Sequence, residues 1–220
     1  MKTNDLEKLR LGLIRHPNIM GKDEFFNSVV LIPLIKLNDE YHFLFEKRAA
    51  NIRQGGEICF PGGAVDSADN GYIETALRET TEEIGVYKDK INILGSLNTL
   101  IGPRGITVDS FIATLDIMSI DDCKIDKTEV ERIFLVPVTF FENNPPEKYK
   151  VVSQIKLMFY DENGLEENLI HSIENANNPN DKSYTENVRN VLVYKTSGEI
   201  IWGITARLIF EVTKILRKKN

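Results

Sequence analysis

The stretch from Gln54 to Val86 constrains the fold most, because it joins a glycine-rich loop to a short acidic helix. It reads QGGEICFPGGAVDSADNGYIETALRETTEEIGV. At about 100° per residue, three carboxylates share one face of the predicted helix, nearly opposite a packing face. The packing face comprises Ile73, Ala76, Leu77, Thr80 and Ile84, and the acidic face comprises Glu79, Glu82 and Glu83.

Local signals mark both ends of this helix. Asp69 or Asn70 can cap its start, and Gly85 suits the left-handed position just past its end. Before it, Gly62 and Gly63 allow the backbone to turn tightly toward the helix. The predicted order is therefore strand, loop and helix, with the acidic side chains beside the loop.

The cluster of Glu79, Glu82 and Glu83 has two interpretations. A solvated acidic surface would explain an isolated ETTEE sequence. Like charges three or four residues apart on a helix repel by roughly 0.2 to 0.5 kcal/mol per pair, and here they adjoin a glycine turn and Arg78. A bound cation explains this arrangement, and oxygen ligands suit Mg²⁺ or Mn²⁺. Because Mg²⁺ is usually held by few carboxylates together with substrate phosphates, we expect a phosphate ester or anhydride as substrate.

These residues resemble the box of the Nudix hydrolases, in which a glycine and a spaced acidic residue precede R-E-x-x-E-E-x-G and an apolar residue. The first half differs from the general box, since eight rather than seven residues separate Asp69 from Arg78. The second half matches at every position, in Arg78, Glu79, Glu82, Glu83, Gly85 and Val86. The resemblance implies an α/β fold, the Nudix α/β/α sandwich with a mixed sheet, and the alternation of strands with few helices agrees with it.

The extra residue and the FPGG sequence resemble the coenzyme A diphosphatase branch of this family. That branch has an upstream motif of the form LLTxRSxxxRxxxGxxxFPGG, and this chain has LFEKRAANIRQGGEICFPGG. Arg48 and Arg53 fit the motif, whereas Ala49 replaces its serine and one residue is missing between Arg53 and Gly56. The resemblance implies that both arginines contact phosphate, since a planar guanidinium can bind phosphate oxygens bidentately. The alternative is a solvated strand end.

The resemblance also implies roles for the acidic helix and the loop before it. Glu79 and Glu83 would be metal ligands, and Glu82 would either complete the metal site or take the proton from water. Arg78 would hold a neighbouring carboxylate in place by an ion pair. Gly62 and Gly63 would shape the loop over the site, and the resemblance places them among the substrate-binding residues.

Two further residues are candidates for the site. Glu129 precedes a predicted strand, and the resemblance implies a glutamate near the site there, which makes it a candidate general base; the alternative is a plain surface glutamate. Arg104 lies in the loop IGPRG, where its side chain could reach substrate, although an ordinary exposed turn explains this position equally well.

Composition limits the class of protein. The 220 residues, 42% of them hydrophobic, suffice for one sizeable core, so we expect a single domain over 1–220. A net charge of −6 argues against a nucleic-acid surface, which would need cationic side chains for the phosphates. The sequence shows no signal peptide and no apolar run of about 18 residues, so we expect a cytoplasmic protein without membrane contact. Cys59 and Cys123 are expected to be reduced.

Periodicity along the chain predicts the remaining elements. Residues 1–24 form a helical extension with a packing helix at 4–16, and the polar, asparagine-rich residues 161–190 form an insertion or mobile loop. A last hairpin leads into a terminal helix from Trp202, whose IWGITA sequence resembles the IWGATA of the same branch. Strands are expected at 28–37, 41–48, 91–100, 106–118, 131–141 and 151–160.

The function implied by the resemblance is hydrolysis of the pyrophosphate bond of coenzyme A or acyl-CoA with Mg²⁺ or Mn²⁺. The products would be 3′,5′-ADP and 4′-phosphopantetheine or its acyl form. One alternative is the same chemistry on another small nucleoside diphosphate derivative, such as ADP-ribose or NADH. Another is a Nudix-fold sensor without turnover, although such a protein would typically have lost one box carboxylate. Whether the chain forms a homodimer stays open.

Overall fold

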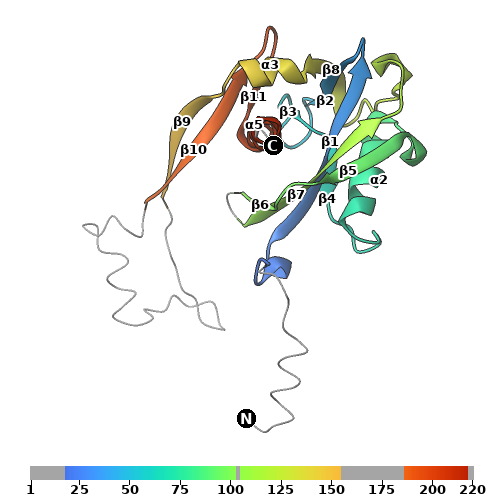
Figure 1. Ribbon diagram of the computed structural model, residues 1–220. Helices are drawn as coiled ribbons and strands as arrows, with labels where there is room; N and C mark the ends of the chain where they lie inside the picture. Colours follow the sequence, from blue (N-terminus) through green and yellow to red (C-terminus); the bar gives the residue numbers. More distant parts are fainter. Residues whose placement is uncertain (1–17, 103–104, 155–185, 218–220) are drawn as a thin grey trace, which may run out of the picture.

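The computed structural model describes residues 18–102, 105–154 and 186–217 (Figure 1). Its elements, in chain order, are η1 (Lys22–Glu24), β1 (Phe26–Leu37), β2 (Glu40–Arg48), β3 (Ile58–Cys59), β4 (Gly62–Ala64), α2 (Tyr72–Ile84), η2 (Lys88–Lys90), β5 (Ile91–Ser96), β6 (Leu100–Ile101), β7 (Ile106–Leu115), η3 (Ile120–Asp122), β8 (Val130–Pro137), α3 (Val138–Asn143), β9 (Glu147–Gln154), β10 (Glu186–Lys195), β11 (Ile200–Trp202) and α5 (Gly203–Leu216). Among the described helices, none combines the length and the apolar character that crossing a bilayer would require.

The described strands form two sheets. The larger has eight strands: five lie in the order β3-β2-β1-β7-β5, and the other three lie off this path, with β4 paired to β1, β6 to β7 and β8 to β2. β1 runs parallel to β7, from the pair Phe26 and Ile106 to the pair Leu34 and Thr114, but antiparallel to β2 and β4. The smaller sheet has the antiparallel order β11-β10-β9. The larger sheet is therefore mixed, as predicted.

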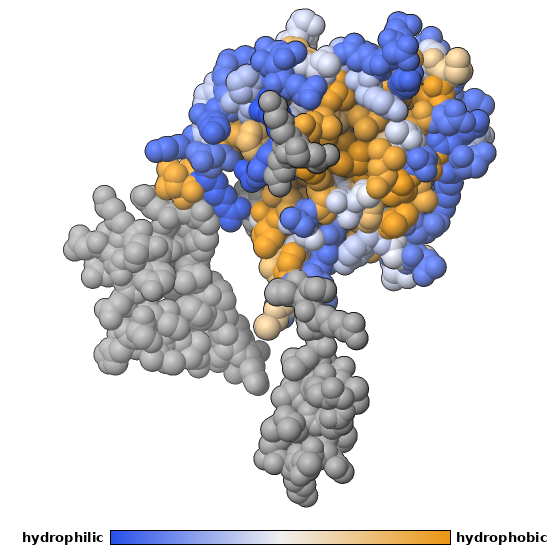
Figure 2. All heavy atoms as spheres, in the orientation of Figure 1, coloured by the Kyte–Doolittle hydropathy of each residue, from blue (hydrophilic) through white to orange (hydrophobic). Residues whose placement is uncertain are grey.

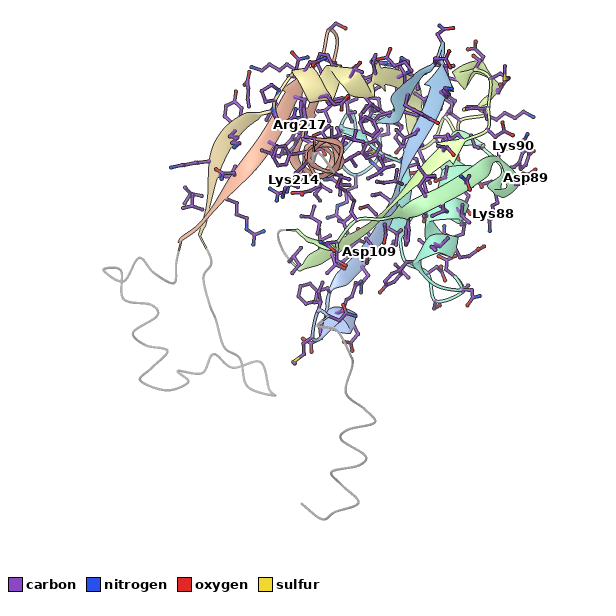
Figure 3. All side chains as sticks on the ribbon, viewed as in Figure 1. Lys88, Asp89, Lys90, Asp109, Lys214 and Arg217 are labelled. Atoms are coloured by element: carbon purple, nitrogen blue, oxygen red, sulfur yellow. The ribbon has the colours of Figure 1, made fainter. Side chains whose placement is uncertain are left out.

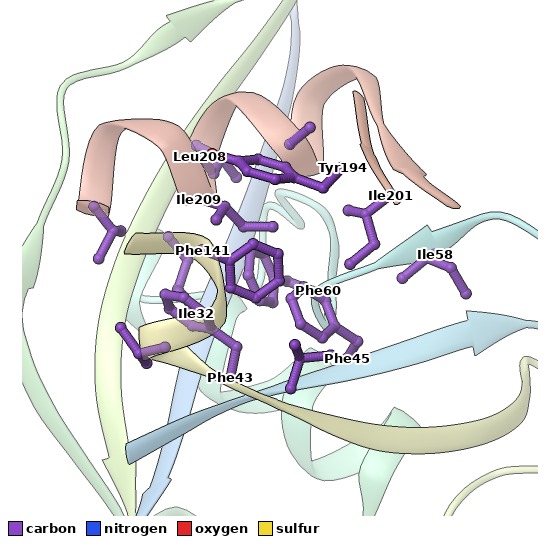
Figure 4. Close-up of a cluster of buried hydrophobic side chains, with 14 of the residues drawn as sticks. Ile32, Phe43, Phe45, Ile58, Phe60, Phe141, Tyr194, Ile201, Leu208 and Ile209 are labelled. Atoms are coloured by element: carbon purple, nitrogen blue, oxygen red, sulfur yellow. The ribbon is translucent and has the colours of Figure 1, made fainter. Parts of the chain in front are cut away.

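Alternating side chains of β1 and β2 divide the core between two helices. One face packs against α2, through Val29, Leu31, Ile35 and Leu44 with Ala76 and Ile84. The other packs against α5, through Ile32, Phe43 and Phe45 with Leu208, Ile209 and Val212 (Figure 4). Burial of each large apolar side chain contributes about 1.5 to 3 kcal/mol. The layers are helix, sheet and helix, which confirms the predicted α/β sandwich.

Polar contacts fix both ends of the described chain. Lys22 Nζ lies 2.7 Å from Asp109 Oδ2, which ties η1 to β7. At the other end, Arg217 Nη2 donates a hydrogen bond to the carbonyl of Phe141 at 3.2 Å, and so holds the end of α5 against α3. Figure 3 labels Asp109 and Arg217 at these two places.

Several element predictions need correction or fall outside the described residues. The expected strand 131–141 is wrong at its end, because the chain turns into α3 after Pro137. The expected insertion 161–190 is wrong for residues 186–190, which form the start of β10. Four of these five residues are polar in the sequence, so no apolar alternation marks the segment. Backbone pairing with β9 maintains the strand instead. The predicted helix at 4–16 and residues 155–185 lie outside the described ranges.

Candidate active site

Helix α2 carries the candidate site. Its predicted end agrees with the structure, whereas its predicted N-terminal cap does not. Gly85 adopts the left-handed conformation at φ 72°, which confirms the predicted helix end. The predicted cap is wrong, because the helix starts after Gly71, at φ 90°. Asp69 instead accepts hydrogen bonds from Thr75 Oγ1 at 2.8 Å and from Arg78 Nε at 3.0 Å. Its carboxylate therefore folds the preceding loop back onto the helix.

The faces of α2 differ from the prediction in two residues. Ala76 and Ile84 are fully buried, as expected, but Ile73 is 45% exposed, so its assignment to the packing face is wrong. Glu83 is only 3% exposed although it belongs to the acidic face. Its Oε2 accepts a hydrogen bond of 2.8 Å from the backbone N–H of Gly62. One predicted acidic residue is thus packed under the glycine loop.

The two glycines of β4 allow this close approach. A Cβ on Gly62 would lie 2.2 Å from the carbonyl oxygen of Val29, and the residue has φ 154°. A Cβ on Gly63 would lie 2.5 Å from the carboxyl carbon of Glu79. Larger residues would therefore push the loop away from the sheet at Gly62 and away from the carboxylate at Gly63.

Arg78 stands at the centre of an ion-pair network on the exposed side of α2. Its Nη1 lies 2.8 Å from Glu79 Oε1 and 3.0 Å from Glu82 Oε2, and its Nε lies 3.0 Å from Asp69 Oδ1. The hydrogen bond to Asp69 raises the pKa of Arg78 and, with that from Thr75, holds the pKa of Asp69 well below its ordinary value. Arg78 therefore orients the carboxylates of Glu79 and Glu82.

The carboxylates differ in their environment. Glu82 is 59% exposed at its side chain, whereas Glu79 is 15% exposed. Burial raises the pKa of Glu79, and it raises that of Glu83 further, with a second contribution from the charge of Glu46. Within the described ranges, no three His, Cys, Asp or Glu side chains are arranged so as to hold a metal ion as they stand.

Glu46 belongs to this neighbourhood although the sequence analysis missed it. Its side chain is 1% exposed, and its Oε1 accepts a hydrogen bond from Cys59 Sγ at 3.1 Å. Burial raises its pKa. The signal that could have found it is its position two residues after Leu44 on a predicted strand, where a charged residue on an apolar face is unusual.

The predicted arginines and Glu129 differ in exposure and in the contacts that they make. Arg48 is partly buried, and its Nε donates a hydrogen bond to the carbonyl of Arg53 at 3.2 Å. The Arg53 side chain is exposed. Glu129 is exposed, its carbonyl accepts a hydrogen bond from the N–H of Ala49 at 2.8 Å, and its charge adds to the raised pKa of Glu79, which is mainly due to burial. Arg104 lies outside the described residues.

A pocket of about 480 Å³ begins at the glycine loop and extends between the two sheets. Its wall near the loop includes Arg48, Cys59, Gly62 and Gly63, whereas Arg53 does not line it. Its remaining wall is largely apolar and includes Leu100, Ile101, Val191, Trp202, Ile204 and Leu208. Figure 2 shows a wide apolar area, bordered by polar residues, on the side that faces the viewer in Figure 1. The pocket thus combines largely apolar walls with charged side chains at several places, including Arg48 near the loop, Arg189 of β10 and Arg207 of α5.

Comparisons with known proteins agree with these features. A family model described as NUDIX domain matches residues 27–176. Nudix hydrolase 3 of Caenorhabditis elegans is 32% identical over 128 residues, which cover 56% of this chain and 53% of that protein. Mitochondrial coenzyme A diphosphatase NUDT8 of Homo sapiens is 30% identical over 114 residues, covering 51% and 48%. Peroxisomal coenzyme A diphosphatase NUDT7 of Mus musculus is 31% identical over 113 residues, covering 51% and 47%.

These similarities extend over part of each relative. The chain spans about half the length of the curated relatives it matches. The family model, in contrast, covers well over half of this chain and includes the whole of the glycine loop and α2. The chain therefore belongs to the Nudix family.

Proposed function

We propose that the protein hydrolyses the pyrophosphate bond of coenzyme A or acyl-CoA, releasing 3′,5′-ADP and 4′-phosphopantetheine or its acyl form. The observation that carries this proposal is the contact of Glu83 and Glu79 with the glycine turn that also lines one end of the pocket. A pyrophosphate placed at this turn would have carboxylates on one side and apolar walls beyond it. Similarity to two coenzyme A diphosphatases supports the choice of substrate.

The side chains at the turn fit a divalent metal ion in their chemistry. Glu79 and Glu83 offer oxygen donors, which suit Mg²⁺ or Mn²⁺, and these two residues would hold the ion. A bound ion of this kind neutralises charge on the anhydride and lowers the pKa of attacking water. Arg78 keeps Glu79 oriented toward the turn, and Gly63 leaves room for its carboxylate. Glu79 would exchange its contact with Arg78 for the ion.

The remaining residues divide between proton transfer and substrate binding. Glu82, exposed at the rim, either completes the metal site or takes the proton from water, and Glu129 is the other candidate for that base. Arg48 lines the pocket and would contact phosphate. Arg53 supports Arg48 through its carbonyl and would contact substrate only at the outer edge of the loop. Gly62 brings its backbone N–H to Glu83 and fixes the shape of the turn.

The test is product analysis with purified protein and Mg²⁺ or Mn²⁺. Coenzyme A, acetyl-CoA, ADP-ribose and NADH are incubated separately, and the products are separated by chromatography. We expect 3′,5′-ADP from the two coenzyme A substrates and little product from the others. Hydrolysis of ADP-ribose or NADH alone would overturn the coenzyme A assignment, and binding of any of them without turnover would indicate a sensor.

A second candidate function is the same reaction on another nucleoside diphosphate derivative. The upstream sequence favours this alternative at one place, since it has one residue fewer between Arg53 and Gly56 than the coenzyme A motif. In addition, Arg53 is not among the residues that line the pocket. The same substrate panel distinguishes the two functions.

A further inference from the structure

Glu46 is a buried carboxylate to which the proposed function assigns no role. Its Oε1 has the Cys59 thiol as hydrogen-bond donor, but its Oε2 is buried without a hydrogen-bond partner among the described residues. A buried carboxylate with an unpaired oxygen is strongly unfavourable when ionised, unless a cation compensates it. The oxygen that lacks a partner is therefore the atom to explain.

The backbone places Glu46 on the same side of the sheet as the candidate metal ligands. Side chains alternate along β2, so Glu46 shares the face of Leu44, which packs with α2. In the adjacent β3, Cys59 is the register partner of Glu46. Three residues further on, Gly62 donates its N–H to Glu83. Glu46 and Glu83 thus approach the same short segment, one from the sheet and one from the helix.

The charges around Glu46 are consistent with this placement. The pKa of Glu83 is raised mainly by its burial and next by the negative charge of Glu46. The pKa of Glu46 is raised mainly by its burial; among the neighbouring charged side chains, Arg48 lowers this pKa most, and Glu129 and Glu79 raise it. The described structure contains no ion pair of Glu46 with Arg48 within 4.0 Å. Arg48 is therefore the strongest charged neighbour of Glu46, but within the described residues no donor pairs directly with its Oε2.

We propose that Glu46 is an additional ligand of the metal ion, binding through Oε2 together with Glu83 and Glu79. The inference rests on the proposed function only in that it requires a divalent ion at the glycine turn. The upstream motif of the coenzyme A diphosphatases has a threonine where this chain has Glu46, so the ligand is additional to the pattern that the sequence resembles. One face of the ion is then held by the sheet and the other by α2.

The test measures Mn²⁺ affinity directly, by electron paramagnetic resonance of free Mn²⁺ and by calorimetry, without substrate. Glu46→Gln keeps the size of the side chain and the acceptor for Cys59, and Glu46→Thr introduces the motif residue. Glu131→Gln, on the neighbouring strand β8, is the matched control because its side chain is 46% exposed. We expect both Glu46 variants to raise the Kd for Mn²⁺ by about tenfold or more, and the control to leave it unchanged.

Two further measurements separate the ways in which the inference can fail. Thermal melts in chelator should show Glu46→Gln at least as stable as wild type, because it removes a buried charge. A variant that lowers the melting temperature but keeps the wild-type Kd would show that Glu46 is structural only. Glu83→Gln tests the proposed site itself: if this change also leaves Mn²⁺ affinity intact, the metal site is wrong as a whole, whereas loss of affinity in Glu83→Gln alone overturns only the role of Glu46.

Discussion

The charge of Glu83 has opposite effects on stability and on the proposed catalysis. Glu83→Gln keeps the size of the side chain and an oxygen to accept the hydrogen bond from Gly62. In chelator the variant should be at least as stable as wild type, because Gln lacks a carboxyl group whose pKa is raised to about 9, first by burial and then by the charge of Glu46. Turnover should fall by at least about a hundredfold, a loss of roughly 2.7 kcal/mol of transition-state stabilisation.

Thermal melts in chelator and in Mg²⁺, run beside the turnover assay, check both effects. Mg²⁺ should stabilise wild type by mass action and should stabilise the variant less. A wild-type rate together with a wild-type Mg²⁺-induced shift in Tm would show that Glu83 is not a metal ligand.

Asp69 connects the same network to pH. Its pKa is lowered in the folded protein, first by Arg78 and then by Thr75, so its ionised form stabilises the fold. This contribution is fully present above the unfolded value of about 3.9 and is lost as pH falls below it. We expect Asp69→Asn to lower the free energy of unfolding at pH 7, and we expect the difference from wild type to shrink as the pH approaches 3.

Urea denaturation of both proteins across this pH range is the measurement. Asp89→Asn serves as the control, because Asp89 is exposed in η2 and is not among the ion-pair partners of Arg78. A difference between Asp69→Asn and wild type that stays constant from pH 7 to pH 3 would contradict the ion pair as its cause.

At the scale of elements, the glycine loop and α2 have different sensitivities to added side chains. The Cβ of Gly62→Ala would meet the backbone of Val29, which cannot move freely, and φ 154° disfavours alanine. The Cβ of Gly63→Ala would meet only the flexible end of Glu79. We expect Gly62→Ala to lose about 1 to 3 kcal/mol of stability, and Gly63→Ala to lose activity and Mn²⁺ affinity with a smaller change in melting.

The two alanine variants act as controls for each other in thermal melts and metal titrations. Equal destabilisation of both would mean that the loop is held by backbone packing at each position. It would remove the argument that Gly63 exists to accommodate the carboxylate of Glu79.

Sequence periodicity predicted the elements whose apolar faces are buried. It missed the helix starts, strand ends and turns that tertiary contacts determine. The core strands and the end of α2 at Gly85 follow from local pattern. The start of α2 does not, because Asp69 bonds to Arg78 rather than capping the helix. The strand character of residues 186–190 depends on pairing with β9, and the turn into α3 depends on packing of Phe141 in the core.

The candidate site was predictable in its motif and less so in its environment. The spacing of the acidic helix located Glu79, Glu82 and Glu83, and the family comparison agrees with the motif. Burial of Glu83 and the unpaired oxygen of Glu46 arise from β2 and β3 packing against α2, which one-dimensional spacing does not express. Whether Arg48 or Arg53 lines the pocket depends likewise on how the intervening loop folds, and only Arg48 does so.

At the scale of the whole molecule, the pocket places the glycine turn and α5 on a common cavity. Its apolar walls come from β6 on the large sheet and from β10 and β11 on the small one. A substrate that fills the pocket must therefore contact both sheets at once. Coenzyme A has the corresponding parts, a charged pyrophosphate and a long, less polar pantetheine arm. Under the proposed function, the small sheet would contact the arm and would take no part in cleavage.

Substitution of Trp202 tests whether the small sheet contacts the arm, because this residue ends β11, lines the pocket and is 47% exposed. Trp202→Ala removes apolar contact area far from the carboxylates, so it should raise KM for acyl-CoA by about tenfold, or about 1.4 kcal/mol, with kcat nearly unchanged. Tyr87→Ala is the matched control, since Tyr87 is 65% exposed and does not line this pocket. The KM of ADP-ribose, which lacks the arm, should not respond if it is turned over at all. A fall in kcat for acyl-CoA at constant KM would instead place Trp202 close to the reacting phosphate and would overturn the assignment of the small sheet to the arm.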